Sequence, residues 1–231
     1  MPGVMLLNGG AEFGPGNETQ DRVLVAAAKP GRAFVLTTAV ARHQPQLAAQ
    51  EARAWFKSLH LEVEDLGLWE RERADSPEMA ARASEGGFFY LAGGDPDVLL
   101  GALQGTATWA AMRRSWREGA ALGGSSAGAM ALCASTPVSV SGGGWRLEPG
   151  LGLVAGAAVL PHFDSPGPGL IQALGSTPDI AFIGLDERTA LCWSGGRWMA
   201  LGRGRVTLLS GSRRQIYGSG SAVDGLADPV S

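Results

Sequence analysis

Short apolar runs alternate with longer amphipathic segments through the first two thirds of the chain. The short runs predict strands at 4–7, 33–38, 61–66 and 87–94. Helical spacing of apolar residues predicts helices at 44–59, 76–85 and 107–119. Strands and helices in alternation require right-handed crossovers and a parallel sheet that helices cover on both faces. The pattern therefore predicts an α/β fold, a three-layer α/β/α sandwich around a mostly parallel, doubly wound sheet.

Beyond Ala134 the pattern changes, because helix formers become rare and glycines frequent. The stretch "STPVSVSGGGWRLEPG" predicts an irregular excursion or a hairpin. The later segments "IAFIGLD", "TALCWSGGRWMALG" and "RVTLLSG" predict short strands with tight turns, which form a C-terminal antiparallel hairpin extension. A chain of 231 residues suits one core, so we expect a single domain over 1–231 with a loosely ordered tail from about Tyr217.

Composition argues against several classes of partner. The net charge of −3 gives no basic excess, so we expect no nucleic-acid partner. No segment approaches the roughly 20 apolar residues of a membrane span, and the N-terminus lacks the basic flank of a secretion signal. We therefore expect a cytoplasmic protein without a membrane partner, with Cys133 and Cys192 as reduced thiols. No two histidines fall at metal-ligand spacing, so we expect no metal and no cofactor. The sequence leaves open whether the chain is a monomer or a homodimer.

A candidate nucleophile lies in the stretch "GAALGGSSAGAM". Residues 124–128 match the nucleophile-elbow pattern G-x-S-x-G between a short apolar strand and a helical run, which is the context that the motif requires. Ser126 occupies the apex, and Ser125 is the spacer before it. The backbone N–H of Ala127 lies at the helix N-terminus, where it can stabilise an oxyanion. A second glycine pair at a strand end, in "FFYLAGGDP", can bring the N–H of Gly94 to the same place.

The candidate general base is His162. Of the three histidines, His43 and His60 lie in segments with a charged or amphipathic helical pattern, which is typical of surface positions. His162 follows the apolar strand "AAVL" directly, so it emerges at the same edge as the elbow. We place substrate contacts at Gly93, Asp95 and Ser125, around the two glycine-rich turns.

Five segments together resemble the S51 serine peptidases, the family of cyanophycinase and peptidase E (aspartyl dipeptidase). They are "LLNGGAEF", "GFFYLAGGDPDVLLGALQGT", "GGSSAGAM", "PGLGLVAGAAVLPHFD" and "IGLDERTAL". The resemblance implies a fold like that of the class I glutamine amidotransferases, with a Ser nucleophile in place of Cys. It also implies Ser126 as nucleophile, His162 as base, an acyl-enzyme, and a small peptide or isopeptide substrate that carries an aspartyl residue at the scissile bond.

The chain departs from this family where the third member of the triad is expected. An acid should follow the nucleophile by some 15 to 18 residues, but 141–144 read "SGGG". Glu148 is the nearest acid before the histidine, and it is our candidate for the third member. The alternatives are a polar substitute such as Ser139 or Ser141, no third member, or Asp164.

Two further departures concern the substrate. The arginine-rich stretch that should follow the histidine is absent from "HFDSPGPGL", and Pro96 replaces the usual glutamine after "GGD". The pair Asp186-Glu187 fits the family pattern, with a role in ordering the site or in closing a hairpin turn. Two hypotheses follow: a serine-type exopeptidase or amide hydrolase, and a catalytically impaired relative that binds a peptide or small molecule.

Overall fold

The computed structural model describes residues 1–140, 144–165 and 179–230, and its centre is a sheet of eight strands. The order across this sheet is β14-β11-β10-β1-β5-β4-β2-β3. The strands are β1 (Met5–Asn8), β2 (Arg32–Leu36), β3 (Glu64–Asp65), β4 (Gly86–Leu91), β5 (Ala121–Ser125), β10 (Thr189–Ser194), β11 (Arg197–Gly202) and β14 (Ala222–Val223). Neighbours from β1 to β3 pair in parallel, whereas β10, β11 and β14 pair antiparallel. The predicted mostly parallel sheet is confirmed.

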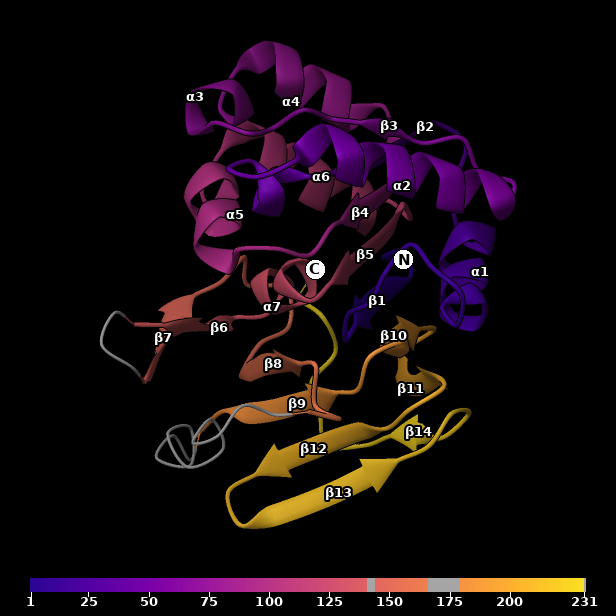
Figure 1. Cartoon of the computed structure of the whole chain (residues 1–231), viewed down its shortest axis with the longest axis vertical. Helices are drawn as coiled ribbons and strands as arrows, with labels where there is room; N and C mark the ends of the chain where they lie inside the picture. Colours follow the sequence, from indigo (N-terminus) through magenta and orange to yellow (C-terminus); the bar gives the residue numbers. More distant parts are fainter. Residues whose placement is uncertain (141–143, 166–178, 231) are drawn as a thin grey trace.

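Helices cover both faces of this sheet (Figure 1). One face packs against α1 (Glu18–Ala26) and α2 (Pro45–Ser58). The other packs against α3 (Arg71–Ala74), α4 (Pro77–Ser84), α5 (Pro96–Leu103), α6 (Ala107–Arg117) and α7 (Ala127–Leu132). A 3-10 turn, η1 (Thr38–Val40), follows β2. Ser76 starts α4 by accepting a hydrogen bond from the amide of Met79, with Pro77 in the first turn, as the sequence predicts.

A second sheet of four strands lies beside the central one, in the order β13-β12-β9-β8 (Figure 1). Its strands are β8 (Ala157–Pro161), β9 (Ala181–Leu185), β12 (Val206–Ser210) and β13 (Arg213–Tyr217). The strands β8 and β9 pair in parallel, and the rest of the sheet is antiparallel. The strand before His162 therefore belongs to this second sheet and not to the central one.

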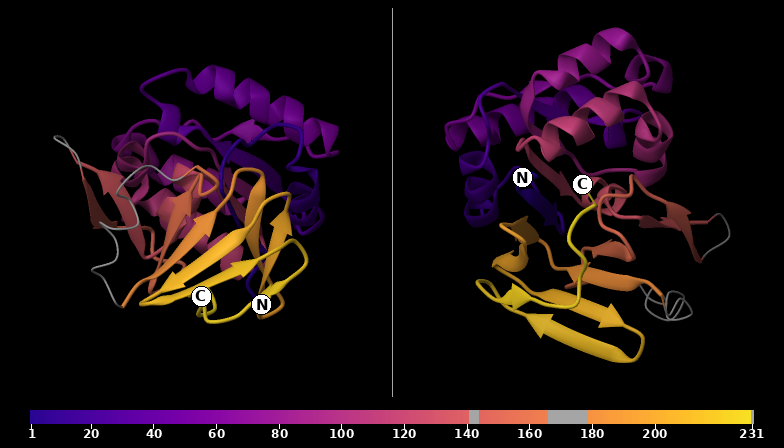
Figure 2. Two further views of the ribbon diagram at one scale, coloured as in Figure 1. Left: turned by 60° about the horizontal axis from the view of Figure 1, so that its bottom comes forward. Right: turned by 180° about the vertical axis from the view of Figure 1, so that it is seen from behind.

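The segment after Ala134 forms the hairpin of β6 (Ser135–Ser139) and β7 (Trp145–Pro149). Figure 2 shows this hairpin projecting from the body of the molecule. Ser139 pairs with Trp145 across it, close to the turn. The hairpin is one of the two alternatives that the sequence left open for this stretch.

The tail from Tyr217 is not loose, contrary to our expectation. Its strand β14 pairs with β11, and Val223 is buried. Two buried indoles also hold the tail: Trp198 donates a hydrogen bond to the carbonyl of Ala227, and Trp193 donates one to Asp228. A buried indole N–H requires an acceptor, and the tail provides both.

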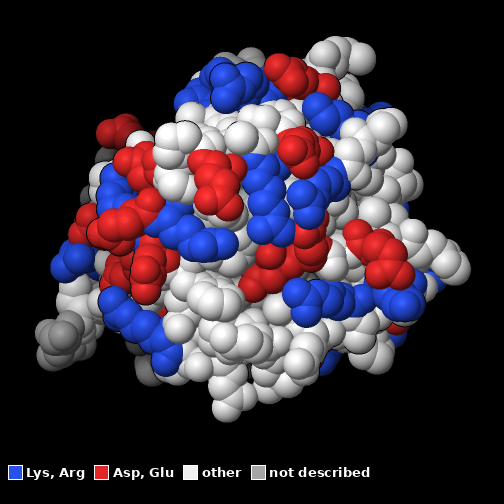
Figure 3. All heavy atoms as spheres, turned by 90° about the horizontal axis from the view of Figure 1, so that it is seen from above, with Lys and Arg blue, Asp and Glu red and all other residues white. Residues whose placement is uncertain are grey.

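Acidic and basic side chains are interspersed on the face over the helices (Figure 3). Glu64 makes ion pairs with Arg32 and Arg82. Among the described residues, no helix is long and apolar enough to cross a membrane.

Candidate active site

The serine at the apex of the elbow has a strained backbone. Ser126 lies between β5 and α7 with φ 47° and ψ −114°, a conformation that costs about 1–3 kcal/mol for a residue other than glycine. Its amide donates to the carbonyl of Asn8, which ties the turn to the end of β1. A Cβ at Gly124 would lie 2.6 Å from the Gly128 carbonyl carbon, so the turn closes only with small residues. The elbow geometry is the one that the G-x-S-x-G pattern predicts.

The imidazole of His162 lies against this serine. Its Nε2 is 3.0 Å from Ser126 Oγ, within hydrogen-bond distance. His162 follows β8 directly with φ 73°, and its amide donates to the carbonyl of Gly9. The ring packs on Gly10, where φ is 131° and a Cβ would collide with the imidazole. The "GG" after β1 therefore provides the space that the imidazole occupies.

The other ring nitrogen faces Glu187 and not Glu148. Nδ1 of His162 lies 3.1 Å from Glu187 Oε1. Glu187 follows β9, whose last residue Leu185 pairs with Pro161 at the end of β8. Because parallel partners end at the same edge, the residues that follow these two strands emerge side by side. The side chains of His162 and Glu187 are 44% and 37% exposed, so solvent reaches the pair.

Our prediction of Glu148 as the partner of His162 is therefore wrong. Glu148 lies on β7, opposite Thr136, and its carboxylate accepts a hydrogen bond from Arg146 on the same strand. The alternatives also differ from expectation. Asp164 accepts a hydrogen bond from the backbone amide of Glu187 at 3.3 Å, so it stabilises the loop that carries Glu187. Ser139 lines a neighbouring cavity, and Ser141 lies outside the described residues.

The two predicted oxyanion donors, the amides of Ala127 and Gly94, lie on the helix after the elbow and on the loop after β4. Ala127 is the first residue of α7, where a helix leaves its N–H groups without intrahelical partners. Gly94 follows β4 with φ 136°, and a Cβ there would lie 2.6 Å from the carbonyl oxygen of Ala39. A Cβ on its neighbour Gly93 would lie 3.2 Å from Ser126 Cβ. The loop after β4 thus passes directly beside the nucleophile, as the sequence predicts.

The three residues that we expected to contact substrate have structural partners instead. Ser125 is fully buried, and its hydroxyl donates to Glu12 at 2.9 Å. The amide of Gly93 donates to the other oxygen of Glu12 at 2.7 Å. Asp95 caps α5 by accepting the amides of Asp97 and Val98. The hydroxyl of Ser125, the amide of Gly93 and one carboxylate oxygen of Asp95 are thus engaged within the protein.

Glu12 is a residue that sequence reasoning missed. Its carboxylate joins the loop after β4, through Gly93, to the end of β5, through Ser125. These two segments carry the candidate oxyanion donor and the nucleophile. The sequence signal for Glu12 is the "GGAE" of the first segment. Its glycines leave space for the imidazole of His162, and its acid bonds Gly93 and Ser125.

A layer of buried polar side chains lies behind the elbow. Asn17 accepts hydrogen bonds from Asn8 at 3.0 Å and from Gln20 at 2.8 Å. Asp21 is fully buried and accepts a hydrogen bond from Trp55 at 2.7 Å. Burial raises the pKa of Asp21 to about 7.

Within 1–140, 144–165 and 179–230, no group of three His, Cys, Asp or Glu side chains is arranged to hold a metal ion. Both cysteines are buried and unpaired. Burial raises the pKa of the Cys133 and Cys192 thiols, which disfavours the reactive thiolate.

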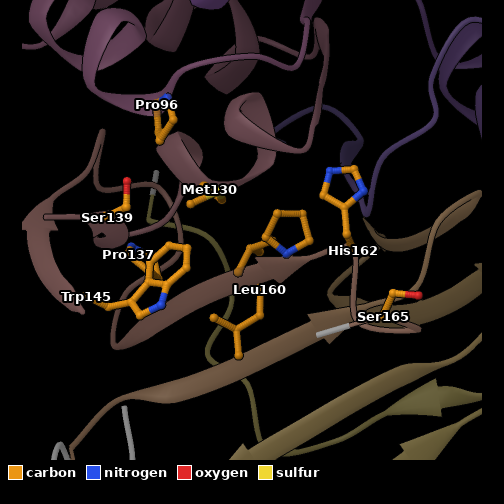
Figure 4. Close-up of a pocket in the computed structure, with 10 residues that line it drawn as sticks. Pro96, Met130, Pro137, Ser139, Trp145, Leu160, His162 and Ser165 are labelled. Atoms are coloured by element: carbon orange, nitrogen blue, oxygen red, sulfur yellow. The ribbon is translucent and has the colours of Figure 1, made fainter. Parts of the chain in front are cut away.

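A cavity of about 270 Å³ opens beside the imidazole. Figure 4 shows His162 at one side of it, with Trp145 and Pro137 opposite. Its lining is formed by Pro96, Met130, Pro137, Ser139, Trp145, Val159, Leu160, Pro161, His162 and Ser165.

Comparison with known proteins places this site in a family. The model of peptidase family S51 matches residues 5–201, which include the elbow, the imidazole and the acid. The chain belongs to peptidase family S51. It is therefore a peptidase of the serine hydrolase type, and its mixed α/β fold with a mostly parallel central sheet matches that of its structural neighbours.

Relatives of this S51 peptidase include cyanophycinases. That of Trichormus variabilis is 29% identical over 220 residues, covering 89% of this chain and 73% of the relative. That of Synechococcus elongatus is 32% identical over 161 residues, covering 64% and 49%.

Among solved structures, a peptidase from an acI-B1 Actinobacterium is 28% identical with a TM-score of 0.86, over 97% of this chain and 98% of the other. A putative peptidase E from Listeria monocytogenes EGD-e shares the fold, with a TM-score of 0.65 at 16% identity over 88% of this chain and 100% of the other.

Proposed function

We propose that this S51 peptidase cleaves small peptides or isopeptides through an acyl-enzyme, with Ser126 as nucleophile, His162 as general base and Glu187 as the orienting acid. The observation that carries the proposal is the continuous chain of contacts: 3.0 Å from Ser126 Oγ to His162 Nε2 and 3.1 Å from Nδ1 to Glu187. Nucleophile, base and orienting acid in hydrogen-bond sequence are the arrangement that activates a serine.

The geometry assigns a role to each ring nitrogen. When Nδ1–H donates to the Glu187 carboxylate, the lone pair of Nε2 faces Ser126 Oγ. Nε2 takes the hydroxyl proton as Oγ attacks the scissile carbonyl, and the imidazolium then gives this proton to the leaving amine. Water hydrolyses the resulting ester with His162 again as the base. The amides of Ala127 and Gly94 are the proposed donors to the oxyanion.

A catalytically impaired, binding-only protein is the less favoured alternative. Its motivation was the missing acid in the stretch before the histidine. Glu187, which follows the histidine in the sequence, places a carboxylate oxygen against Nδ1 of His162. The motivation for the binding-only alternative therefore no longer applies.

The test is active-site labelling with a fluorophosphonate probe, followed by peptide mass spectrometry to locate the label. We expect the label on Ser126 and none on the Ser126→Ala protein. Ser84→Ala is the matched control, because Ser84 is an exposed serine on α4 whose hydroxyl donates to the carbonyl of Ala80. Equal labelling of the wild type and Ser126→Ala would refute the proposal. Hydrolysis of Asp-Xaa and β-aspartyl dipeptides by the same proteins gives a second readout.

A further inference from the structure

The cavity beside His162 has an apolar lining that several parts of the fold build together. Met130 comes from α7, one turn after the proposed nucleophile, and Pro96 is the first residue of α5. Val159, Leu160 and Pro161 come from β8 and lead directly to the imidazole. The cavity therefore borders His162, the residue that we propose transfers the proton (Figure 4).

The β6–β7 hairpin forms the outer wall. Pro137 and Ser139 lie two residues apart on β6, so they point to the same face, and Trp145 is the cross-strand partner of Ser139. Arg146, the next residue along β7, points to the opposite face from Trp145, and it pairs with Glu148, which shares that face. The strand alternation thus puts apolar and small side chains on the cavity side of the hairpin.

Among the described residues, the lining carries no Lys, Arg, Asp or Glu. Its polar side-chain groups are the imidazole, the hydroxyls of Ser139 and Ser165 and the indole N–H of Trp145. Asp164, the nearest acid along the chain, is engaged with the amide of Glu187. A charged side chain entering this cavity would lose water without gaining an opposite charge, which is costly.

We propose that this cavity is a specificity pocket for one uncharged, aliphatic or aromatic side chain of the substrate. The proposal rests on the function proposed above for Ser126 and His162, and it adds the class of side chain. The volume of about 270 Å³ is just below the range of about 300–1,000 Å³ that accommodates whole drug-sized ligands. It therefore suits a single side chain beside the scissile bond. The arginine-rich stretch expected after the histidine is replaced by "HFDSPGPGL", which is consistent with a substrate that carries no charge here.

The experiment compares two dipeptide series, Xaa-Ala and Ala-Xaa, in which Xaa is Leu, Phe, Ala, Arg or Asp. We expect, in one series, kcat/KM for Leu or Phe to exceed that for Ala by about 10- to 100-fold, since each methylene buried in an apolar pocket contributes about fourfold and Leu adds three carbons to Ala. Arg and Asp should fall below Ala. A preference for Arg or Asp in both series would overturn the pocket.

Trp145→Ala tests the wall itself. It should raise KM for the Leu and Phe substrates and flatten the preference, while turnover of the Ala substrate stays within a few-fold. Trp69→Ala is the matched control, because Trp69 is also 38% exposed but donates to Thr37 elsewhere on the surface. An unchanged preference in Trp145→Ala, or an equal loss in both variants, would refute the assignment.

Binding to the Ser126→Ala protein separates the pocket from the chemistry. Calorimetry should show tighter binding of the favoured Leu dipeptide than of its Arg and Asp counterparts, whether or not the wild type turns over. If Ser126 is labelled but all the dipeptides bind equally, the proposed specificity pocket is wrong and the proposed function stands. Absence of labelling with selective apolar binding would overturn the function and support the pocket.

Discussion

Replacement of Glu187 by Gln tests the proposed orienting acid, whose partner the sequence does not reveal. Gln keeps the size of the side chain and an oxygen that can accept Nδ1–H of His162. It loses the negative charge that favours this tautomer and stabilises the imidazolium formed during attack. Its amide can also turn an N–H toward Nδ1, which leaves a proton on Nε2 and blocks acceptance of the Ser126 proton.

The size of the effect follows from the exposure of the pair. Amidation of a buried triad carboxylate costs about 10⁴-fold in kcat. Here the two side chains are 44% and 37% exposed, so water screens part of the charge interaction. We therefore expect a loss of about 100- to 1,000-fold in kcat/KM, which corresponds to about 3–4 kcal/mol of transition-state stabilisation.

Glu148→Gln is the matched control, because Glu148 is the acid that precedes the histidine in the chain and its carboxylate bonds Arg146. Its kcat/KM and its rate of fluorophosphonate labelling should remain within about twofold of the wild type, as for most surface ion pairs. Thermal unfolding of both variants excludes a folding defect. A Glu187→Gln protein that labels at the wild-type rate, or a Glu148→Gln protein that loses more than Glu187→Gln, would refute the assignment of the acid.

Three other substitutions test the support of the site. Gly10→Ala should slow labelling by about 100-fold or more while the protein stays folded, because the new Cβ displaces the imidazole; labelling kinetics and circular dichroism check this. Glu12→Ala leaves the Gly93 amide and the Ser125 hydroxyl without an acceptor, so it should lower the free energy of unfolding by about 1–3 kcal/mol in urea titrations, with Glu12→Gln milder. Asp21 has a pKa raised from 3.8 to about 7, so the folded state binds more protons than the unfolded state between these pH values and stability falls as pH rises through them. Asp21→Asn should therefore stabilise the protein by up to about 4 kcal/mol at pH 8 and by almost nothing at pH 4; an equal effect at both pH values would contradict the burial of the charge.

The fold was predictable where local pattern and burial agree. The strand over 87–94 is a continuous apolar run, and β4 is buried along its whole length. The helix that begins after Ser76 carries its own cap and proline. In contrast, α5 was missed because "PDVLLGAL" is apolar on nearly all sides, and such a short run does not distinguish a helix from a strand. The predicted strand over 61–66 reduces to two residues, because β3 lies at the sheet edge with a single partner.

The site was predictable to the extent that its chemistry is local in sequence. Ser126 stands in a pentamer whose glycines are required by the turn, and His162 follows its strand directly. Glu12 and Gly10 act across the fold, on residues at least 81 positions away, so no spacing reveals them. Glu187 was visible as part of a motif, but its partner was not. Only the parallel pairing of β8 with β9 shows that Glu187 faces His162.

The chain order of the triad explains why the acid was sought on the wrong side of the histidine. A triad is defined by geometry and not by order, so an acid can follow the histidine as well as precede it. The register Pro161 with Leu185 brings the ends of β8 and β9 together, and both following loops contain residues with positive φ, His162 and Arg188. The elbow, in contrast, is built on the central sheet by β5. Ser126 and the His162–Glu187 pair thus stand on two different sheets, and the end of β1 contacts both, because Asn8 accepts the amide of Ser126 and Gly9 accepts the amide of His162. A change in the loop of Gly9 and Gly10 after β1 should therefore separate Ser126 from His162 while each sheet remains intact.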